Sequence, residues 1–268
     1  MDTGNLALSA FLLLAAIGFV AGAIGTLVGA GGGFLIVPAL LLLRPEATPA
    51  ELASTSLAVV FFNAYSGTAA YLRMGRLDSY AATLFALASV PGAALAALLV
   101  HEVPRGAFQG VFGVLLLALG LAVLRDPLGP PRPGAAAGRA PDLRADRRRA
   151  RIGAIGSAYV SSAASLLGIG GGIVQVPFLV RVLAFPPHLA TAVSQAVLTV
   201  SALAATVVHV ARGTLEGRLD ETLSLAVGVM MGAPVGAALS ARVGGAAIVR
   251  ALGAALCLVG VRLLLRLL

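Results

Sequence analysis

The sequence of 268 residues has no tryptophan or lysine, a single cysteine and only 11% charged residues. Soluble domains contain about 25% charged residues, so this charge content is too low for an ordinary soluble protein. One cysteine excludes an intrachain disulfide and any metal site made of several cysteines. The sequence also contains no CxxC pair and no catalytic pattern of serine, histidine and aspartate. We therefore expect neither an enzyme nor a bound cofactor.

Acidic residues are missing from the apolar segments. All 11 aspartates and glutamates fall in the termini, the loops or the ends of the expected helices. Carboxylates within a membrane are the usual groups of proton relays and cation sites. Their absence argues against a cation transporter and favours a neutral or anionic substrate.

Apolar residues, by contrast, make up 59% of the chain, and the mean hydropathy is +0.99. Several apolar stretches reach the roughly 20 residues that a helix needs to cross a bilayer. The first stretch could instead be a signal peptide. However, the residues before it, MDTGN, include no basic residue, and the apolar run is longer than the core of a signal peptide. The sequence therefore predicts an all-α polytopic membrane protein.

Much of the net charge of +8 comes from arginines in one central segment, residues 125–151. Cytoplasmic loops of membrane proteins carry such an excess of basic residues, so we place this segment inside the cell. Its prolines and glycines indicate a flexible linker. It lacks interleaved aromatic residues and a folded platform, so we expect no nucleic-acid partner.

Two glycine runs indicate an internal repeat. Residues 29–38 read GAGGGFLIVP, and residues 168–177 read GIGGGIVQVP. The sequence GRLD also occurs twice, at 75–78 and at 217–220. We interpret the chain as a tandem duplication with three parts: a first membrane repeat (1–124), the arginine-rich cytoplasmic linker (125–151) and a second membrane repeat (152–268).

Each repeat divides into five helical pieces, of which the second is short. The expected pieces are 6–28, 33–43, 51–72, 79–100 and 105–124, then 152–167, 172–185, 189–211, 221–242 and 246–267. A membrane span takes about 17–25 residues, more than the second piece of either repeat provides. Glycine-rich backbone precedes both short pieces. Non-helical backbone at membrane depth is tolerated only beside protein or a water-filled cavity, as in the broken helices of secondary transporters.

Two copies of GxGGGxxxVP, joined by a hydrophilic linker and followed by helices that contain serine and threonine, resemble the sulfite exporter TauE/SafE family. The resemblance extends from about Leu8 to Leu265. It implies a multi-pass permease of the bacterial plasma (inner) membrane that exports sulfite, organosulfonates or related anions. The implied partners are a small sulfur-containing anion and membrane lipid, and an oligomer is left open.

The glycine runs are the predicted anion site. A break before a helix leaves backbone N–H groups without partners, and their dipoles favour negative charge. Side chains on the following helices would complete one site between the repeats, near the bilayer midplane. The predicted residues are Gly31, Gly32, Gly33, Thr55, Ser56, Asn63, Gly170, Gly171, Gly172, Gln175, Ser194 and Gln195.

In an alternative interpretation, the glycines serve only the packing of helices. Small residues four apart let membrane helices approach closely, and serine or asparagine can simply form hydrogen bonds between helices. The protein would then be a non-transporting membrane scaffold or accessory subunit. A consecutive triplet of glycines is not the spacing that such packing needs, so we favour transport.

The direction of the repeats is also open. If each short piece completes a crossing, the repeats are parallel; if it forms a hairpin, they are inverted. The arginines outside the linker do not decide between the two. We expect inverted repeats with the amino terminus outside the cell, because a site between inverted repeats gives alternating access. A membrane potential, negative inside, is worth about 2.3 kcal/mol per charge per 100 mV and drives an uncoupled anion outward, so we expect export.

Overall fold

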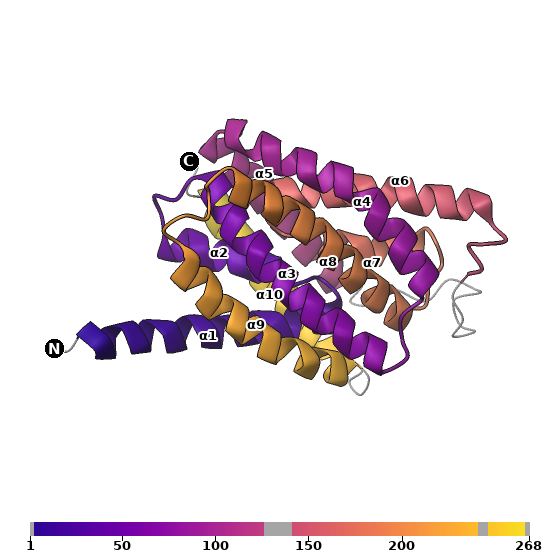
Figure 1. The fold of residues 1–268 in the computed structure, drawn as a ribbon, viewed down its shortest axis with the longest axis horizontal. Helices are drawn as coiled ribbons and strands as arrows, with labels where there is room; N and C mark the ends of the chain where they lie inside the picture. Colours follow the sequence, from indigo (N-terminus) through magenta and orange to yellow (C-terminus); the bar gives the residue numbers. More distant parts are fainter. Residues whose placement is uncertain (1–2, 126–140, 241–245, 266–268) are drawn as a thin grey trace.

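The computed structural model describes residues 3–125, 141–240 and 246–265, and the regular structure within these ranges is helical. The helices are α1 (Thr3–Val28), α2 (Gly33–Leu43), α3 (Pro49–Arg73), α4 (Ser79–Leu99), the short 3-10 helix η1 (Val100–Glu102), α5 (Arg105–Arg125), α6 (Arg147–Leu166), α7 (Gly172–Arg181), α8 (Pro187–Ala211), α9 (Leu219–Ser240) and α10 (Ala246–Leu265) (Figure 1). The predicted all-α class is confirmed. Five helices in these ranges are long and apolar enough to cross a membrane: α1, α5, α8, α9 and α4 with η1.

Two helix boundaries differ clearly from the expected ones. α6 begins at Arg147 rather than at residue 152, because Asp146 caps its first turn by accepting a hydrogen bond from the Arg149 N–H at 2.9 Å. α7 ends at Arg181 rather than at residue 185, and Ala184 beyond it has a φ of 59°. Most of the predicted linker, residues 126–140, lies outside the described residues.

Helices α2 and α7 are the short pieces, and α2 turns back along α1. The turn is tight, since a Cβ added at Gly25 would collide with the backbone of Gly32. At the far end of α2, Arg44 forms an ion pair with Glu221 near the start of α9, with 2.6 Å between Nη2 and Oε2. The start of α9 lies beside the first half of α1, so α1 and α2 form a hairpin.

Glycines four residues apart, Gly18 and Gly22 on α1 and Gly228, Gly232 and Gly236 on α9, bring the two helices into close contact. Gly18 packs on the backbone of Leu225, and Gly236 packs on the backbone of Ala23. Residue numbers therefore increase together along the contact, and the two helices run in the same direction. In the same way α4 and α6 run parallel to one another, with Phe85 against Gly153 and Gly92 against Ser162.

Helices α3 and α8 run in opposite directions through the centre of the molecule (Figure 1). The Ser54 hydroxyl at the start of α3 donates to the Thr214 carbonyl just beyond α8, at 3.3 Å. At the other end Tyr71 packs against Ala192, near the start of α8. In Figure 1, α1 begins at the left of the bundle and α6 at the right.

This pattern supports inverted repeats. If the first five helices correspond to the last five, α1 corresponds to α6 and α4 to α9. The parallel contact between α1 and α9 then corresponds to the parallel contact between α6 and α4. Likewise α3 corresponds to α8, which runs in the opposite direction. The internal repeat itself stays a prediction.

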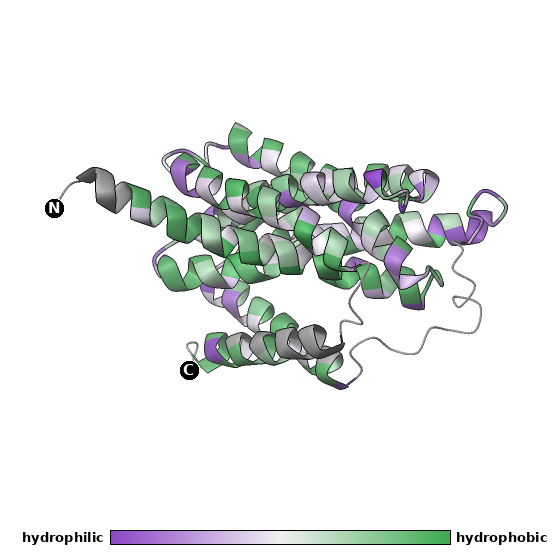
Figure 2. Cartoon of the chain, turned by 90° about the horizontal axis from the view of Figure 1, so that it is seen from below, coloured by the Kyte–Doolittle hydropathy of each residue, from purple (hydrophilic) through white to green (hydrophobic). Residues whose placement is uncertain are grey.

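Hydrophobic residues run along most of the helices, while hydrophilic residues gather near the loops and helix ends (Figure 2). Leu87 of α4 and Met231 of α9, for example, are 65% and 64% exposed. Large exposed apolar surfaces of this kind are unusual in soluble monomers and normal on faces that contact lipid. The fold therefore positions α3, α8 and the two helix breaks in the interior.

Candidate functional site

The two glycine runs lie directly against one another in the interior. A Cβ added at Gly33 would lie 2.6 Å from the carbonyl oxygen of Ile169. A Cβ at Gly172 would collide with the carbonyl of Gly29 and with Ala30. Both contacts join one half of the chain to the other, so the structure brings the two runs together at one place, without room for a side chain at either glycine.

The turns before the two short helices need glycine for a second reason. Gly32 and Gly171, the residues that precede α2 and α7, have φ angles of 78° and 98°. This left-handed region is costly for residues with a Cβ. Neither glycine has a side chain that could cap the helix, so the first N–H groups of each short helix depend on other partners.

Two of the predicted backbone donors already have partners. The Gly31 N–H donates to the Gly25 carbonyl at 3.2 Å, and the Gly170 N–H donates to the Ala164 carbonyl at 3.4 Å. The unpartnered donors follow one residue later in each run. Within the part of the chain that the structure describes, no hydrogen bond engages the N–H groups of Gly32, Gly33, Phe34, Gly171, Gly172 or Ile173.

Asn63 of α3 adds a side-chain donor beside the first run. It is fully buried, and its Oδ1 accepts a hydrogen bond from the Thr26 hydroxyl at 3.2 Å. Its Nδ2 has no partner among the described residues and lies 3.7 Å from the position that a Cβ on Gly32 would take. The amide hydrogens of Asn63 are therefore available next to the start of α2, where the backbone donors are unpartnered.

Gln195 of α8 belongs to the same buried group. Its Nε2 donates to the Gly25 carbonyl at 3.5 Å, while its Oε1 has no partner among the described residues. This oxygen lies 3.2 Å from the position of a Cβ on Gly67, one helical turn beyond Asn63. Thr26, Asn63 and Gln195 thus form a polar group of three side chains beside the first glycine run.

Ser56 and Ser194 bind the glycine runs crosswise. The Ser56 hydroxyl on α3 donates to the Gly168 carbonyl at 2.7 Å. The Ser194 hydroxyl on α8 donates to the Gly29 carbonyl at 2.8 Å. Each serine therefore holds the run of the other half, and its hydroxyl hydrogen is not free for an anion. Both serines position the runs in this structure.

The remaining predicted residues are buried but less closely tied to the runs. Thr55 lies beside Ser56, and its hydroxyl has no partner among the described residues. Gln175 of α7 donates from Nε2 to the Ser157 hydroxyl of α6 at 2.7 Å, which joins the second short helix to its neighbour. Because the corresponding residue of α2 is Ile36, the surroundings of the two runs are not equivalent.

Val60 and Leu198 pack against both runs beside their contact, and the sequence prediction missed both. A Cβ on Gly31 would lie 3.2 Å from Val60 Cγ1 and 3.0 Å from Leu198 Cδ1, and a Cβ on Gly170 would meet the same two side chains. They follow Ser56 and Ser194 by one helical turn, a spacing that places them on the same helix faces.

The sequence matches the family model described as sulfite exporter TauE/SafE over residues 14–263. A probable membrane transporter protein YunE of Bacillus subtilis is 29% identical over 76% of this chain and 79% of its own length. A probable membrane transporter protein of Methanocaldococcus jannaschii is 25% identical over 83% of this chain and 81% of its own length. A third, from Xylella fastidiosa, is 32% identical over 61% of this chain and 59% of its own length.

No solved structure matches the chain. The family match covers nearly all of the described helices, including both glycine runs. The relatives are named as membrane transporters, in agreement with the apolar helices of the fold. The chain therefore belongs to the sulfite exporter TauE/SafE family and is a multi-pass transporter of the plasma membrane.

Proposed function

We propose that this transporter exports a small sulfur oxyanion, sulfite or an organosulfonate, which binds at the start of α2. The observation that carries the proposal is a set of buried donors without partners in one place: the N–H groups of Gly32, Gly33 and Phe34 with Nδ2 of Asn63. Leaving one such group buried and unpaired costs about 1–3 kcal/mol. An oxyanion that accepts their hydrogen bonds would offset that cost.

These donors suit a transported anion, which must be released from the site as well as bound. They are neutral dipoles, and each interaction of this kind is worth roughly 0.3–2 kcal/mol. Removing the anion from water costs free energy, so we expect micromolar to millimolar affinity. The second run supplies further backbone donors at Gly171 and Gly172, but its counterpart of Asn63 is Ser201, whose hydroxyl donates to Leu198 of its own helix. We therefore place the anion nearer the first run.

Alternating access follows from the position of the site. The donors lie between halves that we infer to be inverted, and Val60 and Leu198 pack against both runs. Transport would proceed as the halves rock and these side chains withdraw to one side and then the other. Because the membrane potential is negative inside, it favours outward movement of an uncoupled anion.

Flux of labelled sulfite in proteoliposomes tests the proposal. A potential imposed across the vesicles should accelerate efflux when the inside is negative, and unlabelled methanesulfonate should compete with sulfite if sulfonates share the site. Protein-free vesicles are the control. The proposal would be wrong if no sulfur oxyanion or sulfonate moved faster than in the protein-free vesicles.

The scaffold alternative rests on the close packing at Gly33 and Gly172, which gives both glycines a structural reason. Replacing glycines cannot separate the two functions, because Gly32 has a positive φ and an alanine there would be strained. Asn63→Leu is the better discriminator, since it removes the donor without touching the backbone. A scaffold should tolerate that change, and a transporter should not.

A further inference from the structure

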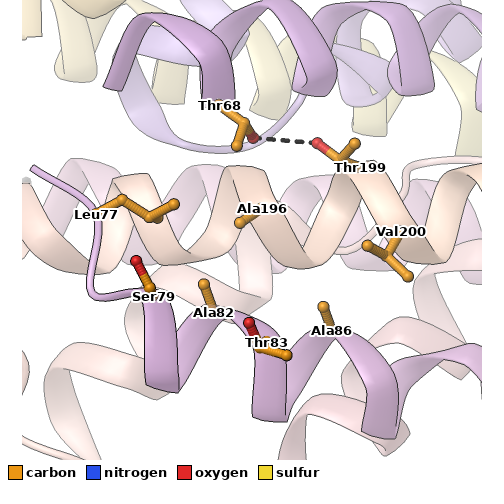
Figure 3. Close-up of a pocket in the computed structure, with 9 residues that line it drawn as sticks. All are labelled: Thr68, Leu77, Ser79, Ala82, Thr83, Ala86, Ala196, Thr199 and Val200. Carbon is orange, nitrogen blue, oxygen red and sulfur yellow. Dashed lines mark hydrogen bonds between the residues drawn. The ribbon is translucent and has the colours of Figure 1, made fainter. Parts of the chain in front are cut away.

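A cleft lies between α4, α8 and the end of α3, away from the glycine runs (Figure 3). Its volume is about 300 Å³, and its lining combines the hydroxyl groups of Thr68, Ser79, Thr83 and Thr199 with apolar side chains (Leu77, Ala82, Ala86, Ala196 and Val200). No charged side chain lines it. The hydroxyl groups can donate hydrogen bonds to a passing oxyanion and can also bind water.

The mouth of the cleft lies at the linker end of the molecule. Ser79 is the first residue of α4, which runs parallel to α6 from the end where the linker meets α6. The guanidinium of Arg144, just before α6, lies over the ring of Tyr80 at 4.9 Å from its centroid. The arginines at 144–151 are therefore close to the mouth, and their positive potential would attract anions to it.

The inner end of the cleft is closed by two threonines. The Thr68 and Thr199 hydroxyl oxygens are 3.1 Å apart and joined by a hydrogen bond (Figure 3). Thr199 also donates to the Gln195 carbonyl at 2.9 Å, so its hydrogen is used there and Thr68 must be the donor of the pair. Gly67 precedes Thr68 on α3, and Gln195 lies one turn before Thr199 on α8, with its Oε1 3.2 Å from the position of a Cβ on Gly67. Asn63 lies one turn before Gly67. The threonine pair is therefore next to the polar group beside the first glycine run.

The opposite side of the molecule is different. When Ser56 is aligned with Ser194, Phe61 and Phe62 correspond to Thr199 and Val200 of the cleft. Their rings pack together with centroids 5.1 Å apart. Bulky aromatic rings thus stand where the linker side has a threonine and a valine, which makes the linker side the more open one.

We propose that this cleft is the linker-side entrance through which the anion reaches the site, and that the Thr68–Thr199 pair is its inner gate. The inference rests on the proposed function for the identity of the anion, but not for the position of the entrance. Opening the pair frees the Thr68 hydroxyl to donate to the anion as it passes towards Gln195 and Asn63.

Cysteine labelling tests the entrance without any transport assay. In a Cys257→Ala background, Thr83→Cys lines the cleft, and Leu87→Cys, one turn later on the same face of α4, lies outside the cleft, with 65% exposure of the native side chain. Inside-out and right-side-out vesicles receive a charged maleimide, and Arg148→Cys marks the linker side. Thr83→Cys should react from the linker side at least about tenfold faster than Leu87→Cys, because a charged probe does not enter hydrocarbon.

Two results would overturn the entrance: Thr83→Cys reacting as slowly as Leu87→Cys, or reacting from the side opposite to Arg148→Cys. Methanesulfonate, which does not consume maleimide, should slow the labelling of Thr83→Cys; labelling that it leaves unchanged contradicts passage of a sulfonate. If the wild-type protein carries no sulfur anion at all, the proposed function fails, and the labelling still decides whether the cleft is the linker-side entrance.

A second comparison of variants tests the gate. Thr68→Val keeps the shape but removes the hydroxyl group that donates to the passing anion, and flux from the linker side should fall about tenfold, the effect of one lost hydrogen bond to an anion. Thr68→Ser should restore it. Thr206→Val is the control, because the Thr206 hydroxyl, on α8, has no partner among the described residues. Equal flux in Thr68→Val and wild type would show that the pair is not a gate.

Discussion

At the scale of single residues, Asn63 is distinguished by an amide nitrogen that has no hydrogen-bond partner among the described residues. A buried asparagine ordinarily uses both ends of its amide, yet here only Oδ1 has a partner, the Thr26 hydroxyl. The unpaired Nδ2 lies next to Gly32, whose own N–H is also unpaired. These two neighbouring buried donors are the basis of the proposal that the anion binds here.

Asn63→Leu should therefore impair transport more than it impairs folding. The expected result is a rise of about tenfold or more in the KM for sulfite, because one hydrogen bond to a charged group is worth about 1.5–3 kcal/mol. Concentration series in proteoliposomes would measure it, with thermal unfolding in detergent as the control for stability. Asn63→Asp, of the same size, should be worse because it repels the anion; wild-type flux in both variants contradicts the site.

Ser56→Ala and Ser194→Ala should each reduce transport several-fold by loosening the glycine runs. Each loses one hydrogen bond between the halves, a net loss of about 1 kcal/mol, and leaves a carbonyl unpaired. Flux and unfolding temperature should fall together, since the serines position the runs. Ser89→Ala is the comparison, because this buried hydroxyl bonds only to Ala86 of its own helix. Full activity of both inter-half variants would show that the crossed bonds are dispensable.

At the scale of helices, the contact between α1 and α9 depends on backbone approach. Gly228, Gly232 and Gly236 of α9 each lie against backbone atoms of α1. Such interfaces are driven by packing, since lipid is as apolar as the helix surface. The hairpin of α1 and α2 is held in place through this contact and through the Arg44–Glu221 ion pair.

Gly232→Ala should consequently destabilise the protein by about 1–3 kcal/mol, the usual effect of excess volume in a well-packed contact. The added methyl group would collide with the Phe19 carbonyl. Met231→Ala is the matched control, because the neighbouring Met231 is 64% exposed. Size-exclusion profiles during heating would compare the two; equal melting of both variants and wild type would show that α1 and α9 do not need the close approach.

Most helix limits could be predicted from the sequence because glycine and proline mark them. The GxGGG runs begin both short helices, and the GRLD segments lie just before α4 and at the start of α9. The capping of α6 by Asp146 was missed, since an aspartate within an arginine-rich segment reads as part of the linker.

The predicted site residues are buried together, but their roles could not be predicted from the sequence. Ser56, for example, forms a hydrogen bond to a carbonyl group 112 positions away in the chain.

Val60 and Leu198 illustrate a second limit of prediction. In a chain that is 59% apolar, a valine or leucine between two glycine runs carries no distinguishing pattern. The Thr68–Thr199 pair was hidden for a similar reason, because isolated threonines in membrane helices usually bond to their own backbone. Only packing reveals which of these residues contact both runs or line the cleft.

At the scale of the whole molecule, the order of helix directions fixes where the ends of the chain lie. The first described residues of α1 and the end of α10 lie at the same end of the molecule, and α6 begins at the other end (Figure 1). If the arginine-rich linker lies inside the cell, as its charge predicts, both ends of the chain should be outside. Cysteines placed at residues 4 and 265 should react with an impermeant reagent on intact cells. Both ends reacting only from the cytoplasm would refute the inverted arrangement.

Arg147→Ala should leave the affinity for the anion unchanged. Arg147 begins α6 at the linker end, whereas the donors lie in the interior between the two halves. Charge near the entrance raises the rate of encounter at low salt, but is screened beyond about 8 Å at physiological ionic strength. Binding and flux at two salt concentrations would separate these effects. An Arg147→Ala variant that loses affinity, with Ser56→Ala and Ser194→Ala unaffected, would place the site elsewhere.

The crossed serine bonds also constrain how the protein is made. The Gly29 carbonyl near the amino terminus finds its partner, Ser194, only 165 positions later in the chain. At a synthesis rate of about 5–20 residues per second, the first glycine run waits roughly 8–33 seconds for that serine to leave the ribosome. During this interval its polar backbone is already destined for the membrane without its final partner. Newly made chains should therefore depend on the insertion machinery to shield the first half until the second arrives.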